Sequence, residues 1–320
     1  MLKSIRTYRF LAISVLALSI AVILWGALVR ATGSGAGCGS HWPLCNGVMV
    51  PRAPTLQTVI EFTHRLTSGV LLILMVALVF TAFRAFPKGH PARAASVVSA
   101  IFLVIEALVG AGLVLLELVA DNPSLARGYW MGGHLANTFI LLGCMALGVW
   151  FGWEKRAPRL AGPWSWKFAL ALFLLVLVGI SGAVAALGNT LFPAETLAEG
   201  FRMDAAQESH ILVRLRVIHP LLAAGAAAWL LYIGVVLASD DRKRVRVLAT
   251  LLAAFVAEQI LAGFMNLVLL APTAMQLIHL FLADAVVITT VLLAAATLTP
   301  AALPAALRTT RDATRNERPL

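Results

Sequence analysis

The chain has 320 residues, of which 60% are hydrophobic and 12% charged, and its formal net charge is +10. Soluble domains are about 45–50% apolar and about 25% charged, so this composition excludes an ordinary soluble enzyme and indicates a protein of the lipid bilayer. Three cysteines are too few for a disulfide scaffold or a four-cysteine metal site, although one pair could form a single bridge.

Eight apolar segments are long enough to cross a membrane, which requires about 20 mostly apolar residues. The first follows Lys3, Arg6 and Arg9 and therefore also resembles a secretory signal peptide, but its apolar run exceeds the usual hydrophobic region of about 7–15 residues. We expect an all-α integral membrane protein with eight transmembrane helices. The predicted spans are 9–29, 57–83, 93–118, 129–151, 167–187, 209–237, 246–270 and 275–299.

The basic residues fall mostly on one side of this topology. If the N-terminus is cytoplasmic, 18 of the 25 Lys and Arg residues lie in cytoplasmic segments. Cytoplasmic loops carry such an excess, so we expect both termini to be cytoplasmic and the positive charge to be a topology signal, with lipid and not nucleic acid as the partner. The other seven basic residues are Arg30, Arg52, Arg65, Arg127, Arg202, Arg214 and Arg216.

The two halves of the chain resemble each other. Long outer connections follow the first and fifth spans, and Gly26-Ala27-Leu28-Val29 at the end of the first span is echoed by Gly182-Ala183-Val184-Ala185 at the end of the fifth. The third and seventh spans share a Glu-containing motif, Glu106 to Gly110 and Glu258 to Gly263. We expect two pseudo-symmetric four-helix bundles. The predicted domains are 1–151 and 167–300, with a cytoplasmic linker at 152–166 and a cytoplasmic tail at 301–320.

Four histidines occupy matching positions, near the outer ends of the second, fourth, sixth and eighth spans: His64, His134, His219 and His279. A single intramembrane histidine is more often a hydrogen-bond partner between helices than a ligand, but the repetition at one depth favours ligands. Two neutral imidazoles from facing helices form the axial pair of a haem iron, whereas zinc usually needs three or four protein ligands. His210 and His219 cannot face one site in a regular helix, and we favour His219 because it lies deeper in its span and better matches the position of His64.

Charged residues accompany these histidines. Glu61 precedes His64 by three residues and shares its helix face. Two interpretations of Glu61 stay open: a carboxylate paired with Arg65 or a neighbouring loop, or a proton acceptor beside the first haem site. Arg216, three residues before His219, and Arg214 could hold haem propionates. Glu106 and Glu258, near the middle of the membrane, are either protonated helix contacts or parts of a proton route.

Cys38 and Cys45 lie in the first outer loop and flank the segment Gly39-Ser40-His41-Trp42-Pro43-Leu44. Because the extracytoplasmic side of a membrane is oxidising, we expect a disulfide between them, either structural or redox-active. A C-x-x-C motif for covalent haem attachment is absent from the sequence. Cys144, within the fourth span, is interpreted as a small buried apolar residue.

These motifs together resemble the haem A synthases of bacterial and mitochondrial membranes, of the two-cysteine type, over residues 10–300. The resemblance implies oxidation of the C8 methyl of haem O to the formyl group of haem A, through hydroxylated intermediates, to supply a terminal oxidase. The motifs that carry it are Cys38 to Gly47 with Trp42-Pro43-Leu44-Cys45, Glu61-x-x-His64-Arg65, His134-Leu135, His219-Pro220 and His279-Leu280.

The resemblance also implies a role for each half. His219 and His279 would ligate a permanent haem b, while His64 and His134 would receive the substrate haem O, with Arg65 at the substrate site and Glu61 catalytic. The protein would lie in the bacterial plasma (inner) membrane with its histidines toward the extracytoplasmic side. Haem O synthase and an electron acceptor are the implied partners, and the oligomeric state, including a homo-oligomer, is left open.

Two other functions fit the same residues. A quinol-linked b-type cytochrome that only transfers electrons would use all four histidines for two permanent haems. A transporter built from a duplicated bundle would use the histidines, Glu106 and Glu258 in a proton pathway without haem.

Overall fold

The computed structural model describes residues 2–300, and this part of the chain is all-helical, without strands. Eight of its helical segments are long and apolar enough to cross a membrane, which confirms the predicted fold class. The predicted tail, 301–320, lies outside the described residues. The eight segments are α1 (Leu2–Ala31), α2 (Leu56–Ala85), α3 (Pro91–Leu115), α4 (Leu125–Phe151), α5 (Pro163–Leu191), α7 (Ile211–Arg214) with α8 (Ile218–Leu237), α9 (Lys243–Val268) and α10 (Thr273–Leu298).

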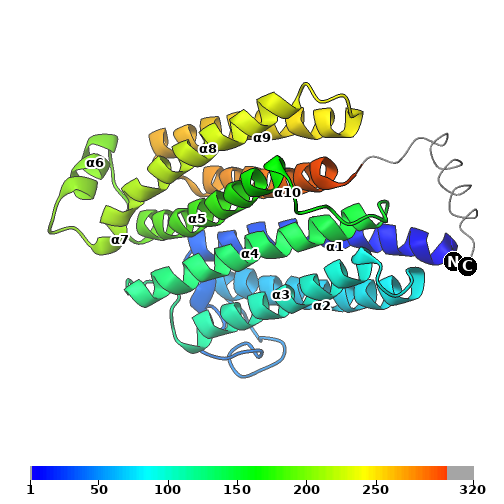
Figure 1. Cartoon of the computed structure of the whole chain (residues 1–320). Helices are drawn as coiled ribbons and strands as arrows, with labels where there is room; N and C mark the ends of the chain where they lie inside the picture. Colours follow the sequence, from blue (N-terminus) through cyan, green and yellow to red (C-terminus); the bar gives the residue numbers. More distant parts are fainter. Residues whose placement is uncertain (1, 301–320) are drawn as a thin grey trace, which may run out of the picture.

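The long helices run side by side in two groups (Figure 1). In the first group α1 packs on α2 and α4, and α3 packs on both α2 and α4; in the second α8 packs on α5 and α9, and α10 packs on both α5 and α9. The groups meet where α4 and α1 contact α5 and α10. The first long loop and the short helix α6 (Leu197–Ala205) lie at one end of the molecule, here called the loop end (Figure 1).

Contact between the two groups depends on small residues. A Cβ atom at Gly179 of α5 would lie 2.7 Å from Cε2 of Phe139 in α4, so only glycine lets these two helices approach so closely. Apolar side chains gain no hydrophobic free energy when they move from lipid into a contact between helices. Association of membrane helices therefore relies on such close packing and on hydrogen bonds between helices. Within the first group, one such hydrogen bond joins α1 to α4, because the buried hydroxyl of Tyr8 donates to the carbonyl oxygen of Gly148 at 2.9 Å.

Local sequence signals explain where several helices begin. The side chains of Thr55 and Ser124 accept hydrogen bonds from the backbone N–H groups of Thr58 and Arg127, so they cap α2 and α4. Proline stands at the first position of α3 and α5, where no intrahelical bond needs its missing N–H.

The predicted span 209–237 is confirmed as one membrane-length segment, Ile211–Leu237. Its helix is interrupted, however, by a 3₁₀ turn at Leu215–Val217 that separates α7 from α8. Pro220 explains this break, because it has no amide hydrogen to donate to the carbonyl oxygen of Arg216 four residues earlier. The helix α6 in the second long connection was also not predicted; the side chain of Thr196 caps it by accepting from the N–H of Glu199.

Candidate functional site

Each of the four intramembrane histidines lies against a glycine of a neighbouring helix. A Cβ atom at Gly26, Gly182 or Gly263 would come within 3.0 Å of Cε1 of its histidine, and one at Gly110 within 4.0 Å. Any larger residue at the three tighter positions would displace the imidazole. The pairs are His64 with Gly26, His134 with Gly110, His219 with Gly182 and His279 with Gly263.

In the second group of helices, His219 of α8 and His279 of α10 face each other. Their ring centres are 6.3 Å apart and the ring planes are perpendicular. A metal–imidazole bond is about 2 Å long, so two imidazoles on opposite sides of one iron have ring centres about 6 Å apart. The spacing of this pair therefore fits a haem iron between the two rings.

Polar neighbours hold both rings of this pair. Ser181 Oγ lies 3.2 Å from Nδ1 of His219, and the side-chain nitrogen of Gln259 lies 3.3 Å from Nε2 of His279. Nδ1 of His279 is buried and has no hydrogen-bond partner among residues 2–300. A buried ring nitrogen without a partner is unfavourable in a purely structural histidine and suits a ring that binds a further group.

In the first group of helices, His134 of α4 lies beside a carboxylate. Its Nδ1 is 3.2 Å from Oε1 of Glu106, without the alignment of a hydrogen bond. Glu106 accepts hydrogen bonds from the side chains of Asn137 and Thr138. Of the two interpretations of Glu106, the contact between helices is therefore present.

Glu258 does not take the corresponding place in the second group of helices. It is exposed on α9, and its neighbour Gln259 contacts His279. Gln259 stands four residues before Gly263 just as Glu106 stands four before Gly110. Grouping Glu106 with Glu258 was therefore wrong by one residue, and the glycine spacing would have identified Gln259.

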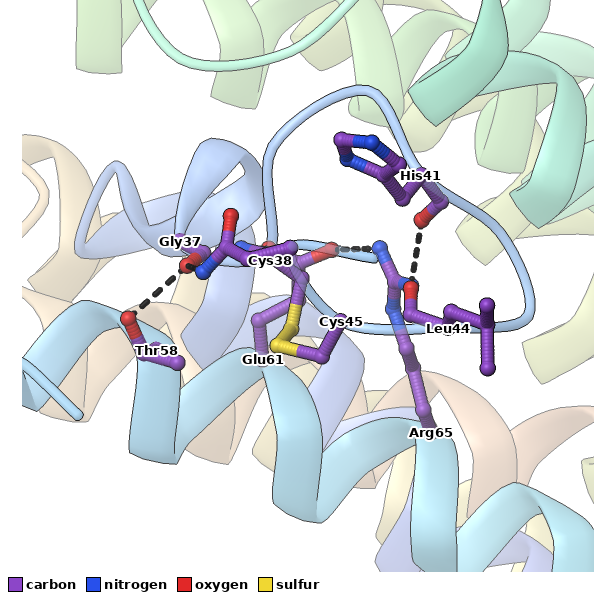
Figure 2. A network of polar contacts seen from close by, with 9 residues as sticks. Gly37, Cys38, His41, Leu44, Cys45, Thr58, Glu61 and Arg65 are labelled. Carbon is purple, nitrogen blue, oxygen red and sulfur yellow. Dashed lines mark hydrogen bonds and ion pairs between the residues drawn. A yellow bond between two sulfur atoms is a disulfide. The ribbon is translucent and has the colours of Figure 1, made fainter. Parts of the chain in front are cut away.

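Glu61 is buried, and each of its two carboxylate oxygens has a polar partner. The backbone N–H of Cys38 donates to its Oε2 at 2.8 Å, and the Arg65 guanidinium forms an ion pair with its Oε1 (Figure 2). The contacts predicted with Arg65 and with a neighbouring loop are thus both present. A role for Glu61 as a proton acceptor stays a prediction.

The loop that holds Glu61 is closed by the disulfide between Cys38 and Cys45, as predicted. Arg65 donates from Nη1 to the carbonyl oxygens of His41 and Leu44, both inside the closed loop and both at 2.7 Å (Figure 2). His41 itself is exposed. The disulfide loop, Arg65 and Glu61 therefore form one connected unit.

The same loop is also attached to the first turn of α2. Thr58 donates from Oγ1 to the carbonyl oxygen of Gly37 at 2.8 Å (Figure 2). A Cβ atom at Gly37 would lie 2.5 Å from the backbone of Gln57, so only glycine permits this approach.

The remaining predicted site residues are more peripheral. Arg216 donates to Oδ1 of Asp204 and Oδ1 of Asn189, each at 2.9 Å, so its charge already has a carboxylate partner. Arg214 is exposed. Their contact with haem propionates therefore stays a prediction.

His210 has a structural role. It caps α7 through its Nδ1, which accepts from the N–H of Leu212, and its ring stacks on Phe192. Because it caps the helix from outside, it is not part of a regular helix with His219.

A set of three or more His, Cys, Asp or Glu side chains arranged to hold a metal ion is absent from residues 2–300. Sequence reasoning missed the roles of three residues: Ser181 and Gln259, which contact the rings of His219 and His279, and Arg30. Arg30, at the end of α1, donates hydrogen bonds to Ala186, Thr190 and Gln276 of the other group of helices.

Residues 9–291 match a family described as COX15-CtaA, cytochrome oxidase assembly protein. Two proteins named protoheme IX farnesyltransferase, from two strains of Thermus thermophilus, are 47% and 46% identical to the chain over 287 residues. That match covers 89% of the chain and 47% of each relative, so the chain spans about half the length of these relatives.

Proteins named heme A synthase match a shorter stretch of the chain. One from Bacillus mycoides is 44% identical over 95 residues, which is 30% of each protein. One from Bacillus cereus is 45% identical over 93 residues, which is 29% of the chain and 30% of the relative.

Proposed function

The chain belongs to the COX15-CtaA family of cytochrome oxidase assembly proteins, and from this premise we propose that it is a haem A synthase. It oxidises the C8 methyl of haem O to a formyl group through hydroxylated intermediates, and the product supplies a terminal oxidase. The observation that carries the proposal is the chemical difference between the two histidine pairs. His219 and His279 have neutral polar neighbours. In the other pair, His134 lies 3.2 Å from the carboxylate of Glu106, and Glu61 stands three residues before His64 in α2.

We assign a different haem to each half. Residues 167–300 hold a permanent haem b through His219 and His279, in line with their ring spacing of 6.3 Å. Residues 1–151 receive haem O through His64 and His134. The haem iron supplies the redox chemistry when bound, and the chain supplies ligands, orientation and proton transfer.

Glu61 is the proposed catalytic carboxylate. Oxidation of a methyl group releases protons, and the Glu61 carboxylate, three residues before His64, is placed to accept one at Oε2. The N–H of Cys38 and the guanidinium of Arg65 hold this carboxylate in place. Arg65 is therefore a positioning residue in this proposal.

The substrate suits a membrane enzyme with a membrane-bound supplier. Haem O carries a farnesyl chain and enters most readily from lipid, between helices. The Thermus relatives are named for farnesyl transfer to protohaem, so we propose that such an enzyme delivers haem O to this chain. The proposed location is the bacterial plasma membrane, with both termini cytoplasmic and the loop end extracytoplasmic. Conversion of the methyl to the formyl group takes its oxygen atom from water and releases four protons and four electrons, so an acceptor for four electrons completes the reaction.

Haem analysis tests this function. The chain is purified from cells that make haem O, its haems are extracted and chromatographed, and the reduced-minus-oxidised spectrum is recorded. Haem B together with haem O or haem A is expected, and His279→Ala should lose haem B while His64→Ala should lose haem O and haem A. Two equivalents of haem B alone would identify the electron-transfer cytochrome, and a protein without haem would exclude both and favour the transporter.

A further inference from the structure

Arg30 reaches from the first group of helices into the second. It lies in the last turn of α1, yet its Nη1 donates to the carbonyl oxygen of Ala186 at 3.0 Å and to Oγ1 of Thr190 at 2.7 Å, both in α5. Its Nη2 donates to Oε1 of Gln276 in α10 at 2.6 Å. The hydrogen bonds that position the guanidinium therefore come from α5 and α10, the helices that carry Gly182 and His279, although Arg30 itself belongs to the first group of helices.

The charge of Arg30 lacks a carboxylate partner among residues 2–300. All three of its acceptors are neutral, and the ion pairs within 4.0 Å in this part of the chain are made by other residues. By contrast, Arg65 has a carboxylate partner in Glu61 and Arg216 has one in Asp204; both arginines also lie toward the loop end. A cation inside a membrane protein is costly unless an anion faces it, so Arg30 calls for an anionic ligand.

The position of Arg30 relative to the second histidine pair limits what that anion is. Ala186 follows Gly182, the neighbour of the His219 ring, by four residues, and Gln276 precedes His279 by three. At about 1.5 Å per residue, both acceptors lie about 4–6 Å from the histidine level along their helices. Both displacements are toward the loop end, where α5 ends and α10 begins (Figure 1).

The donors that remain on Arg30 suit a carboxylate. A guanidinium has five N–H groups, and the three hydrogen bonds above employ two on Nη1 and one on Nη2. The Nε–H and one Nη2–H are left, which is the number that binds both oxygens of one carboxylate. Haem presents its carboxylates on flexible propionate arms at the edge of the ring.

We propose that Arg30 binds a propionate of the haem held by His219 and His279. This inference rests on the proposed function, since it requires a haem between those two histidines. The propionate site is then shared, with its cation from the substrate half and its neutral framework of Thr190 and Gln276 from the other half. It differs from the Arg214 and Arg216 contacts expected from sequence, because Arg216 already has Asp204.

Haem binding with and without free propionates tests the proposal. The haem-free full-length chain is titrated with haem B and with haem B dimethyl ester, and the dissociation constants are read from absorbance for the wild type, Arg30→Gln and the control Arg202→Gln. Arg202 is an exposed arginine of α6, so its loss changes net charge alone. Arg30→Gln should bind haem B about tenfold or more weakly, whereas its affinity for the ester should equal that of the wild type.

The midpoint potential provides an independent readout. Loss of the cation should lower the potential of the haem bound by His219 and His279, because a nearby positive charge favours the reduced iron. Arg30→Lys keeps the charge and should retain most of the potential while losing part of the affinity. Equal weakening of haem B and ester binding in Arg30→Gln, or unchanged affinity for both, would overturn the proposal.

The same titrations separate this inference from the proposed function. If the wild type binds haem B and His279→Ala does not, the assignment of the haem b site holds whatever Arg30→Gln does. If His279→Ala binds haem B as tightly as the wild type, that assignment fails and the propionate site fails with it.

Discussion

The backbone N–H of Cys38 donates a hydrogen bond of 2.8 Å to Oε2 of Glu61. Cys38 is also one end of the disulfide that closes the first long loop. The bridge and the proposed catalytic carboxylate are therefore in direct structural contact, although they stand 23 residues apart in the chain. Opening the loop should thus affect Glu61 before it affects the proposed haem b site, which lies in the other group of helices.

Cys45→Ser tests this connection. Without the bridge, the residues from Cys38 to Leu44 gain freedom and hold Glu61 and Arg65 less firmly, so we expect haem A formation to fall about tenfold or more. The haem B content should stay unchanged. Haem extraction measures both quantities, with Cys144→Ser, which alters the free cysteine of α4, as the control. Full haem A formation by Cys45→Ser would show that the bridge does not position Glu61.

Glu61→Gln tests the carboxylate itself. Glutamine can still accept from the N–H of Cys38 through its side-chain oxygen, but it cannot take up a proton. We expect haem A formation to drop by a factor of about 10²–10⁴, with haem O retained in the protein. Glu258→Gln, a change on the exposed face of α9, is the matched control. Wild-type yields of haem A from Glu61→Gln would remove Glu61 from the mechanism.

Gly182→Ala tests the packing of the second histidine pair. The added Cβ would lie 3.0 Å from Cε1 of His219 and should push the imidazole away from its position opposite His279. We expect haem B content to fall severalfold and the bound fraction to shift from a low-spin to a high-spin spectrum. Gly225→Ala in α8, where a Cβ meets no atom within 4 Å, should leave both unchanged. A normal low-spin spectrum from Gly182→Ala would contradict this account.

An ion pair at the other end of the molecule from α6 predicts a pH effect on stability. Hydrogen bonds from Arg242 lower the pKa of Asp240 below its usual value of 3.8. A lowered folded-state pKa contributes stability above the unfolded pKa, and this contribution is lost as the pH falls through the folded pKa. Asp240→Asn should therefore lower the thermal midpoint at neutral pH. The loss in the free energy of unfolding should be no more than about 1 kcal/mol, because the pair is partly exposed.

Thermal melts in detergent at neutral and acidic pH check this expectation. The difference between wild type and Asp240→Asn should vanish once the pH is below the lowered pKa of Asp240. A difference that persists unchanged in acid would mean that Asp240 stabilises the protein through something other than its charge.

The eight spans, the four intramembrane histidines and the disulfide could be predicted from the sequence because each depends on local or compositional properties. An apolar run of sufficient length becomes a membrane helix wherever it stands, and two cysteines with seven residues of separation can meet in almost any loop. Glu61 was singled out by its helical spacing from His64. The break before α8 also has a local cause, Pro220, although the span over 209–237 was predicted without an interruption.

Only the tertiary structure decided which side chains meet. That Gln259 and not Glu258 contacts His279 depends on the rotation of α9, which its packing against α8 and α10 determines. That Arg30 donates hydrogen bonds to the other group of helices depends on where α1 ends beside α5 and α10. Hydrogen bonds between segments far apart in the chain follow from the relative positions of whole helices, and those positions result from packing over many residues at once, which no local stretch of sequence specifies.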